Sequence, residues 1–136
     1  MFDVATAEHE AAHLVVGLAL GLRLRKATIV PSPLGRTGIA CGYVWFYSDR
    51  KYLAQAIMSA AGIIWDERSG LNSDISGSVD LKNMKALVSL SDIPTCFSLA
   101  KELLEGRRRL HARVASELCD RDLGPADVER LVLEHN

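Results

Sequence analysis

The sequence has no cysteine pair of the kind that forms a disulfide framework or binds a metal ion. Its three cysteines, Cys41, Cys96 and Cys119, are odd in number and far apart, and no two form a Cys-x-x-Cys arrangement. Small secreted domains usually contain even sets of cysteines that cross-link the fold. We therefore expect buried thiols and a cytoplasmic location, and any metal site must use other side chains.

The chain also lacks an excess of charge of either sign. Lys and Arg number 16 against 17 Asp and Glu, a formal net charge of -1, so no global field attracts nucleic acid or anionic lipid. The basic run Arg107–Arg109, with His111 and Arg113 beyond it, follows two glutamates and contains no aromatic residue. This pattern favours a solvated helix face over a phosphate-binding patch, and we expect no nucleic-acid partner.

Long apolar runs are absent as well. The longest, from Leu14 to Leu22, contains two glycines and is far shorter than the ~20 residues of a membrane-spanning helix. The N-terminus has no basic stretch followed by an apolar one, so we expect neither a secretory signal nor a membrane span. With 136 residues, 49% of them hydrophobic, the chain is long enough for one domain, residues 1–136, with its own core.

The hydrophobic periodicity predicts a mainly α fold, an array of about six helices. The first helix begins with Thr6 as its cap and ends at about Leu20. It is apolar almost all round, as expected of a central, buried helix. Caps, glycines and prolines place the other helices at about 48–69, 80–90, 94–105, 107–119 and 125–134.

Two stretches rich in β-branched and aromatic residues lie between the first and second helices. Arg25–Val30 and Ile39–Tyr47 predict a small two-stranded β-ribbon with a long connection, and Gly42 suggests a bulge. An exposed edge of this ribbon would hold an extended peptide by strand addition. A purely structural ribbon fits the sequence equally well.

The strongest functional signal is the motif His9-Glu10-Ala11-Ala12-His13 in the first helix. Helical spacing places His9 and His13 on one face, with Glu10 beside them. Burial of two imidazoles without partners is costly, and a metal ion removes that cost. The pattern is typical of zinc hydrolases, in which the two histidines bind Zn²⁺ and the glutamate is the general base.

Two imidazoles are an incomplete site, because catalytic zinc usually has three protein ligands and one open position. The metzincin continuation His-x-x-Gly-x-x-His is excluded, since Val16 and Ala19 occupy the required positions. The spacing leaves six candidates for the third ligand: Asp66, Glu67, Asp74, Asp80, His111 and His135.

The order of these features resembles the peptidase domain of the FtsH-type membrane-anchored AAA zinc proteases. Ala7–His13 is similar to that family's His-Glu-Ala-Gly-His helix, although Ala12 replaces its glycine. Lys26–Pro31 and Gly42–Phe46 look like its paired strands, and Ala61–Glu67 looks like its Gly-Gly-Arg-Ala-Ala-Glu-Glu helix. Ser76–Leu81 is similar to the Gly-Ala-Ser-Asn-Asp-Leu turn whose last Asp is the third zinc ligand. The resemblance extends over nearly the whole chain.

This resemblance implies that Asp80, at the start of a helix, completes the zinc site with His9 and His13. Asp74 is the nearest rival, since the two residues belong to one predicted loop. Asp66 and Glu67 then either orient a ligand histidine or form ordinary surface charge.

The resemblance also implies a zinc metallopeptidase with Glu10 as the general base, acting on flexible or unfolded polypeptides. The sequence contains no Walker loop and no membrane helix, so we expect activity without ATP. The sequence leaves open whether the chain forms a homo-oligomer and whether a separate unfoldase acts with it. The alternative is a non-enzymatic FtsH-like module that binds a metal or a peptide and regulates a partner. The presence of Glu10 favours the enzyme, because a binding module needs no general base.

Overall fold

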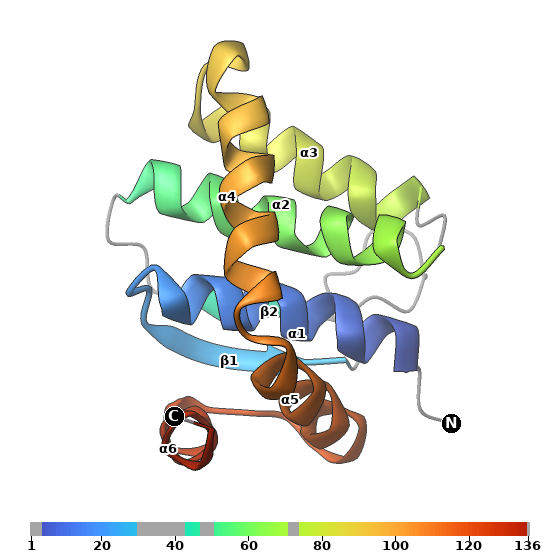
Figure 1. Cartoon of the computed structure of the whole chain (residues 1–136), viewed down its shortest axis with the longest axis vertical. Coiled ribbons are helices and arrows are strands. Elements are labelled where there is room, and N and C mark those ends of the chain that lie inside the picture. The colour runs from blue at the N-terminus through green and yellow to red at the C-terminus, as the bar shows by residue number, and fades with distance from the viewer. Residues whose placement is uncertain (1–3, 30–42, 47–50, 71–73, 136) are drawn as a thin grey trace.

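The structure, a computed structural model, describes residues 4–29, 43–46, 51–70 and 74–135, with the backbone alone at 43, 45, 46 and 74–78. These residues form six α-helices, one short 3-10 helix and two strands (Figure 1), which confirms the predicted mainly α fold. In chain order the elements are α1 (Val4–Ala19), β1 (Leu24–Thr28), β2 (Tyr43–Phe46), α2 (Tyr52–Arg68), α3 (Asp74–Leu87), η1 (Leu90–Asp92), α4 (Ile93–Glu105), α5 (Arg108–Asp120) and α6 (Pro125–Glu134).

Helix α1 lies at the centre of the fold, as its apolar composition predicts. One of its faces, which includes Leu14 and Val15, packs with β1, α5 and α6. The opposite face, which includes Ala12 and Val16, packs with α2, α3 and α4. Helix α1 therefore separates two hydrophobic clusters, and most side chains along it are surrounded by protein.

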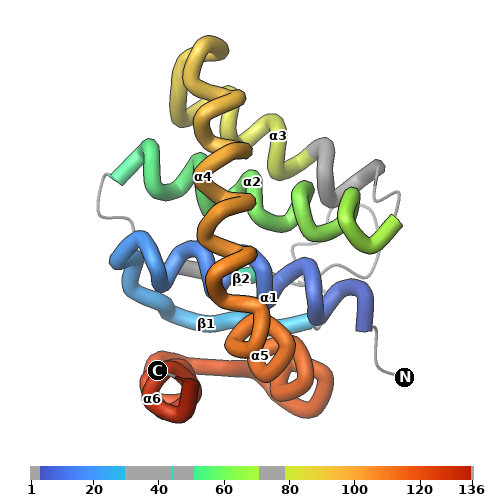
Figure 2. Tube along the Cα trace, viewed as in Figure 1, coloured from blue at the N-terminus to red at the C-terminus, as the bar shows by residue number. Residues whose placement is uncertain are grey.

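Helices α1, α2 and α3 lie side by side, and α4 crosses them and leads into α5 (Figure 2). The face of α2 that is buried is rich in small residues, Ala56, Ala60, Ala61 and Gly62. Small side chains allow the backbones of packed helices to approach closely. The close approach of α1 and α2 decides the geometry of the site described below.

Three predicted helix starts are wrong, those of α1, α2 and α3. Helix α1 begins at Val4, so Thr6 lies inside its first turn and is not the cap. Helix α3 begins at Asp74, and Asp80 lies within the helix instead of at its start. The residues before Asp80 are poor helix formers, but propensity is a weak preference that packing against α2 overrides. The predicted caps of α2, Ser48 and Asp49, lie outside the described residues, and the helix begins later than predicted, at Tyr52 with Lys51 at the N-cap position.

The predicted ribbon is present as an antiparallel pair in which Thr28 faces Tyr43 and Ala27 faces Val44. Its register is irregular between Leu24 and Lys26, whereas the bulge expected at Gly42 lies outside the described residues. On the other side of β1, Ala27 and Leu123 exchange two backbone hydrogen bonds, each 2.9 Å long. The β1 edge is therefore occupied at Ala27, and a peptide cannot add a strand at that point.

None of the described helices is both long and apolar enough to cross a membrane. Two cysteines, Cys96 and Cys119, lie in the described residues and form no disulfide there, while Cys41 lies outside them.

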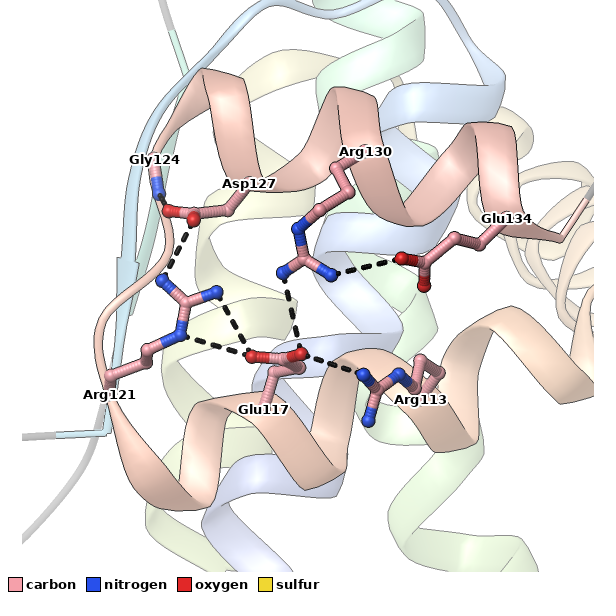
Figure 3. Close-up of polar contacts among 7 residues, drawn as sticks. All are labelled: Arg113, Glu117, Arg121, Gly124, Asp127, Arg130 and Glu134. Atoms are coloured by element: carbon pink, nitrogen blue, oxygen red, sulfur yellow. Dashed lines mark hydrogen bonds and ion pairs between the residues drawn. The ribbon is translucent and has the colours of Figure 1, made fainter.

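A network of ion pairs joins α5 to α6 (Figure 3). The Glu117 carboxylate accepts from Arg113 and Arg121, each at 3.0 Å, and from Arg130 at 3.4 Å. Partial burial works to raise the pKa of Glu117, but the hydrogen bonds and charges of these arginines hold it below its ordinary value. Arg121 also donates to Asp127 at 2.7 Å, and Asp127 accepts from the Gly124 backbone N–H at 2.9 Å. Glu117 thus links α5 to α6 through Arg121 and Arg130, and Asp127 holds the turn between the two helices.

Replacement of Glu117 by Gln should lower the free energy of unfolding by about 0.5–1 kcal/mol, because the arginines around it are half exposed and their attraction is screened. The pKa of Glu117 is lower in the folded than in the unfolded protein. Its ion pairs therefore contribute fully to the free energy of unfolding above the unfolded pKa of about 4.3, and this contribution is lost as pH falls through the folded pKa. Urea denaturation at several pH values measures this. Glu129→Gln, an exposed α6 residue without an ion pair among the described residues, is the control. A pH-independent difference between E117Q and wild type contradicts the prediction.

Candidate metal centre

Two helices, α1 and α3, bring the predicted ligands together. His9 and His13 lie one turn apart on α1, and both are buried, at 6% and 5% exposure. Asp80 extends from α3, with 13% of its side chain exposed. Of the described residues, these three form the group of His, Cys, Asp and Glu side chains that is able to hold a metal ion.

The three potential ligand atoms form a nearly regular triangle. His9 Nε2 is 3.1 Å from His13 Nε2 and 3.1 Å from Asp80 Oδ2, and His13 Nε2 is 3.2 Å from the same oxygen. A tetrahedral zinc ion with bonds of about 2.0–2.1 Å separates its ligand atoms by about 3.3–3.4 Å. The triangle therefore fits a zinc ion with small outward movements of the side chains.

The other nitrogen of each imidazole is held by α2. His13 Nδ1 donates to the Met58 carbonyl oxygen at 2.7 Å, and His9 Nδ1 donates to the Asp66 carboxylate at 2.9 Å. Because a carbonyl oxygen only accepts, the proton of neutral His13 is on Nδ1 and its Nε2 carries a lone pair. The Asp66 carboxylate fixes His9 in the same way. Carbonyl and carboxylate partners of this kind are the ones that orient metal-bound histidines.

These contacts leave three acceptors facing one another. The Oδ2 atom of Asp80 is buried and makes no hydrogen bond of good geometry to any described residue. Two lone pairs of neutral imidazoles lie within 3.2 Å of it. Such an arrangement is unfavourable unless a cation, either a proton or a metal ion, lies among the three atoms.

The pKa values show the same preference for positive charge. Burial works to lower the pKa of His9, but the Asp66 and Asp80 carboxylates, with the charge of Glu10, raise it to about 10. Burial also opposes protonation of His13, and the charge of Asp80 nevertheless raises its pKa. For Asp80, burial works to raise the pKa, but the charge and proximity of His13 lower it to about 2.

Glu10 lies beside this triangle. Its Oε1 is 3.9 Å from His9 Nε2, and the residue is 5% exposed. Burial raises the pKa of its carboxyl group, although the charges of His13 and His9 work against that rise. The Glu10 carboxylate is therefore buried within one side-chain length of the three ligand atoms.

The remaining candidates for the third ligand are placed elsewhere or lie outside the described side chains. Asp66 is buried against His9 and orients it, whereas Glu67 is exposed. His111 donates to the Glu8 carbonyl oxygen at 2.8 Å, and His135 ends α6. Asp80 Oδ2 lies within 3.2 Å of both Nε2 atoms, whereas the side chain of Asp74 lies outside the described ones.

The basic run that suggested a nucleic-acid site belongs to the α4–α5 turn and α5. Arg107 donates to the Leu103 carbonyl oxygen, and Arg113 pairs with Glu117. These contacts agree with the predicted solvated helix face.

Sequence reasoning missed the role of Gly62 on α2. A Cβ at this position would lie 2.5 Å from His9 Cε1 and 2.6 Å from His13 Nε2. Met58, Gly62 and Asp66 follow one another at four-residue spacing and so lie on one face of α2. Met58 accepts a hydrogen bond from His13, Asp66 accepts one from His9, and Gly62 leaves space for both rings. A glycine inside a helical pattern, where it costs about 1 kcal/mol relative to alanine, was the available signal.

Replacement of Gly62 by Ala should displace both imidazoles and lower the free energy of unfolding by about 1–3 kcal/mol, despite the better helix propensity of alanine. Chemical denaturation and the ring ¹⁵N shifts of His9 and His13 measure the two effects. Gly106→Ala is the matched control, because the nearest atoms to its added Cβ are backbone oxygens at 3.7 and 3.9 Å. Unchanged ring shifts in G62A would show that the site has room for a methyl group.

No family model, curated protein or solved structure matches the chain. The function is therefore inferred from the motif and from the geometry of this centre.

Proposed function

We propose that the chain is a zinc-dependent metallopeptidase that cleaves flexible or unfolded polypeptides. One observation carries the proposal: three acceptor atoms from His9, His13 and Asp80 meet in a buried triangle of zinc-like dimensions, with the Glu10 carboxylate beside it. A site that only had to fill space would need neither the unpartnered Asp80 oxygen nor the buried Glu10.

The ligand set indicates which ion the site would hold. Two imidazole nitrogens and one carboxylate oxygen are donors that zinc accepts in catalytic sites, and three protein ligands leave a position open for water. When bound, zinc lowers the pKa of its water and polarises a substrate carbonyl.

The residues of the chain supply the remaining parts of the reaction. Asp66 and the Met58 carbonyl keep the Nε2 atoms of the two histidines turned toward the ion. Glu10 accepts the proton released from the attacking water and transfers it to the leaving amine nitrogen. The peptidase assignment, as distinct from hydrolysis of other carbonyl compounds, rests on the resemblance of the Ala7–His13 and Ser76–Leu81 segments to the FtsH-type peptidase domain.

Replacement of Glu10 by Gln should keep zinc and the fold while slowing cleavage of casein or of a quenched unfolded peptide by at least ~100-fold, because the proton acceptor is gone. Metal content by mass spectrometry, circular dichroism and cleavage with and without a chelator measure these properties. Glu67→Gln, at an exposed position on α2, is the matched control. Wild-type cleavage by E10Q contradicts the proposal. Bound zinc without any chelator-sensitive cleavage by the wild type points instead to the non-enzymatic module.

Zinc affinity should rise with pH through the neutral range. Since the pKa values of His9 and His13 are raised in the metal-free site, zinc must displace protons from the imidazoles, about one or two per ion. Calorimetric titration in buffers of different ionisation enthalpy counts the protons released. A zinc affinity that does not change between about pH 6 and pH 8 would mean that the ion is bound elsewhere.

A further inference from the structure

A cavity of about 600 Å³ lies between α1, α2, α4 and α5. Its lining includes Glu8, Trp65, Arg68, Leu104, Arg108 and His111, and none of the metal-centre residues. Cavities of about 300–1,000 Å³ are typical of sites for small organic molecules.

Two aromatic rings form one wall of this cavity. The centroids of the Trp65 and His111 rings are 4.1 Å apart, and their planes are inclined by 46°. Trp65 Nε1 donates to the Glu8 carboxylate at 2.9 Å, and His111 Nε2 donates to the Glu8 carbonyl oxygen at 2.8 Å. Both rings are therefore held in place by Glu8, and the carboxylate of Glu8 already has a donor.

The floor of the cavity is one face of α5. Ala112, Ala115 and Cys119 follow Arg108 at helical spacing and are small, and Leu104 adds an apolar side chain from α4. This surface suits a flat or narrow apolar body. Asp120 lies at the far end of α5 from Arg108, so the floor has a positive and a negative end.

Arg108 is the available cation. Arg68, the other arginine of the lining, pairs with Glu105 at 3.0 Å. Arg108 is exposed, and it makes no ion pair with any residue in the described part of the chain. It is also the first residue of α5, where the helix dipole favours an anion. A guanidinium group carries two parallel N–H donors, the geometry that a carboxylate matches.

We propose that this cavity binds a small organic acid, with its carboxylate on Arg108 and its aromatic or aliphatic body against Trp65 and the small residues of α5. The proposal is independent of the metal centre, since no lining residue binds the ion or moves the proton.

The test uses 4-phenylbutyrate as the probe and Trp65 as the reporter. The full chain contains two tryptophans, so Trp45→Phe leaves Trp65 as the single source of tryptophan fluorescence. Calorimetry with the wild type and with this variant checks that the substitution does not change binding. We expect saturable binding of one phenylbutyrate per chain at millimolar or lower concentration. The neutral alcohol 4-phenylbutanol should bind at least about tenfold more weakly, because it lacks the charge that Arg108 pairs with.

Three variants locate the site. Arg108→Gln should weaken phenylbutyrate binding about tenfold, whereas Arg109→Gln, an exposed neighbour outside the lining, should leave it unchanged. Ala112→Phe, at an exposed lining position, should block binding by filling the cavity. Circular dichroism confirms that each variant is folded. Equal binding of the acid and the alcohol, equal effects of R108Q and R109Q, or binding that survives A112F would each overturn the proposal.

Discussion

Three buried acceptor atoms that face one another need a positive charge between them, and this requirement links α1, α2 and α3. Each helix supplies what the others lack: α1 the imidazoles, α3 the carboxylate, and α2 the groups that fix the proton positions. Without a cation the three acceptors repel one another. Occupation of the centre is therefore coupled to the packing of these helices, whichever cation is bound.

The residues of the centre differ in how far the sequence predicts them. His9, Glu10 and His13 are neighbours in one helix, so local spacing is enough to place them together. Asp80 is distant in sequence, and spacing alone left six candidates for its role. The resemblance to a known turn selected it, although the structure shows that the residue lies within a helix and not at its start. Gly62 escaped prediction because its importance depends on what packs against it.

The elements themselves were more predictable than their ends. Pro94, Gly106 and Gly124-Pro125 mark the starts and stops of α4, α5 and α6, since proline and glycine act on the backbone directly. The length of helix α3 was underestimated because its first turns contain serine and glycine, which prefer non-helical structure. That preference is small compared with the free energy gained from tertiary packing. The pairing of Ala27 with Leu123 joins segments far apart in the chain, and no local pattern reveals it.

The two supports of the imidazoles differ in chemical kind. Asp66 holds His9 with a side chain, so the identity of that residue matters. Met58 holds His13 with its main-chain carbonyl oxygen, an atom that every amino acid supplies. Among variant chains that retain the centre, position 66 should consequently be restricted to acceptors, while position 58 is free to change with the demands of packing. A comparison of the residues tolerated at each position would then reveal the support from Asp66 but not the one from the Met58 carbonyl, although the site depends on both.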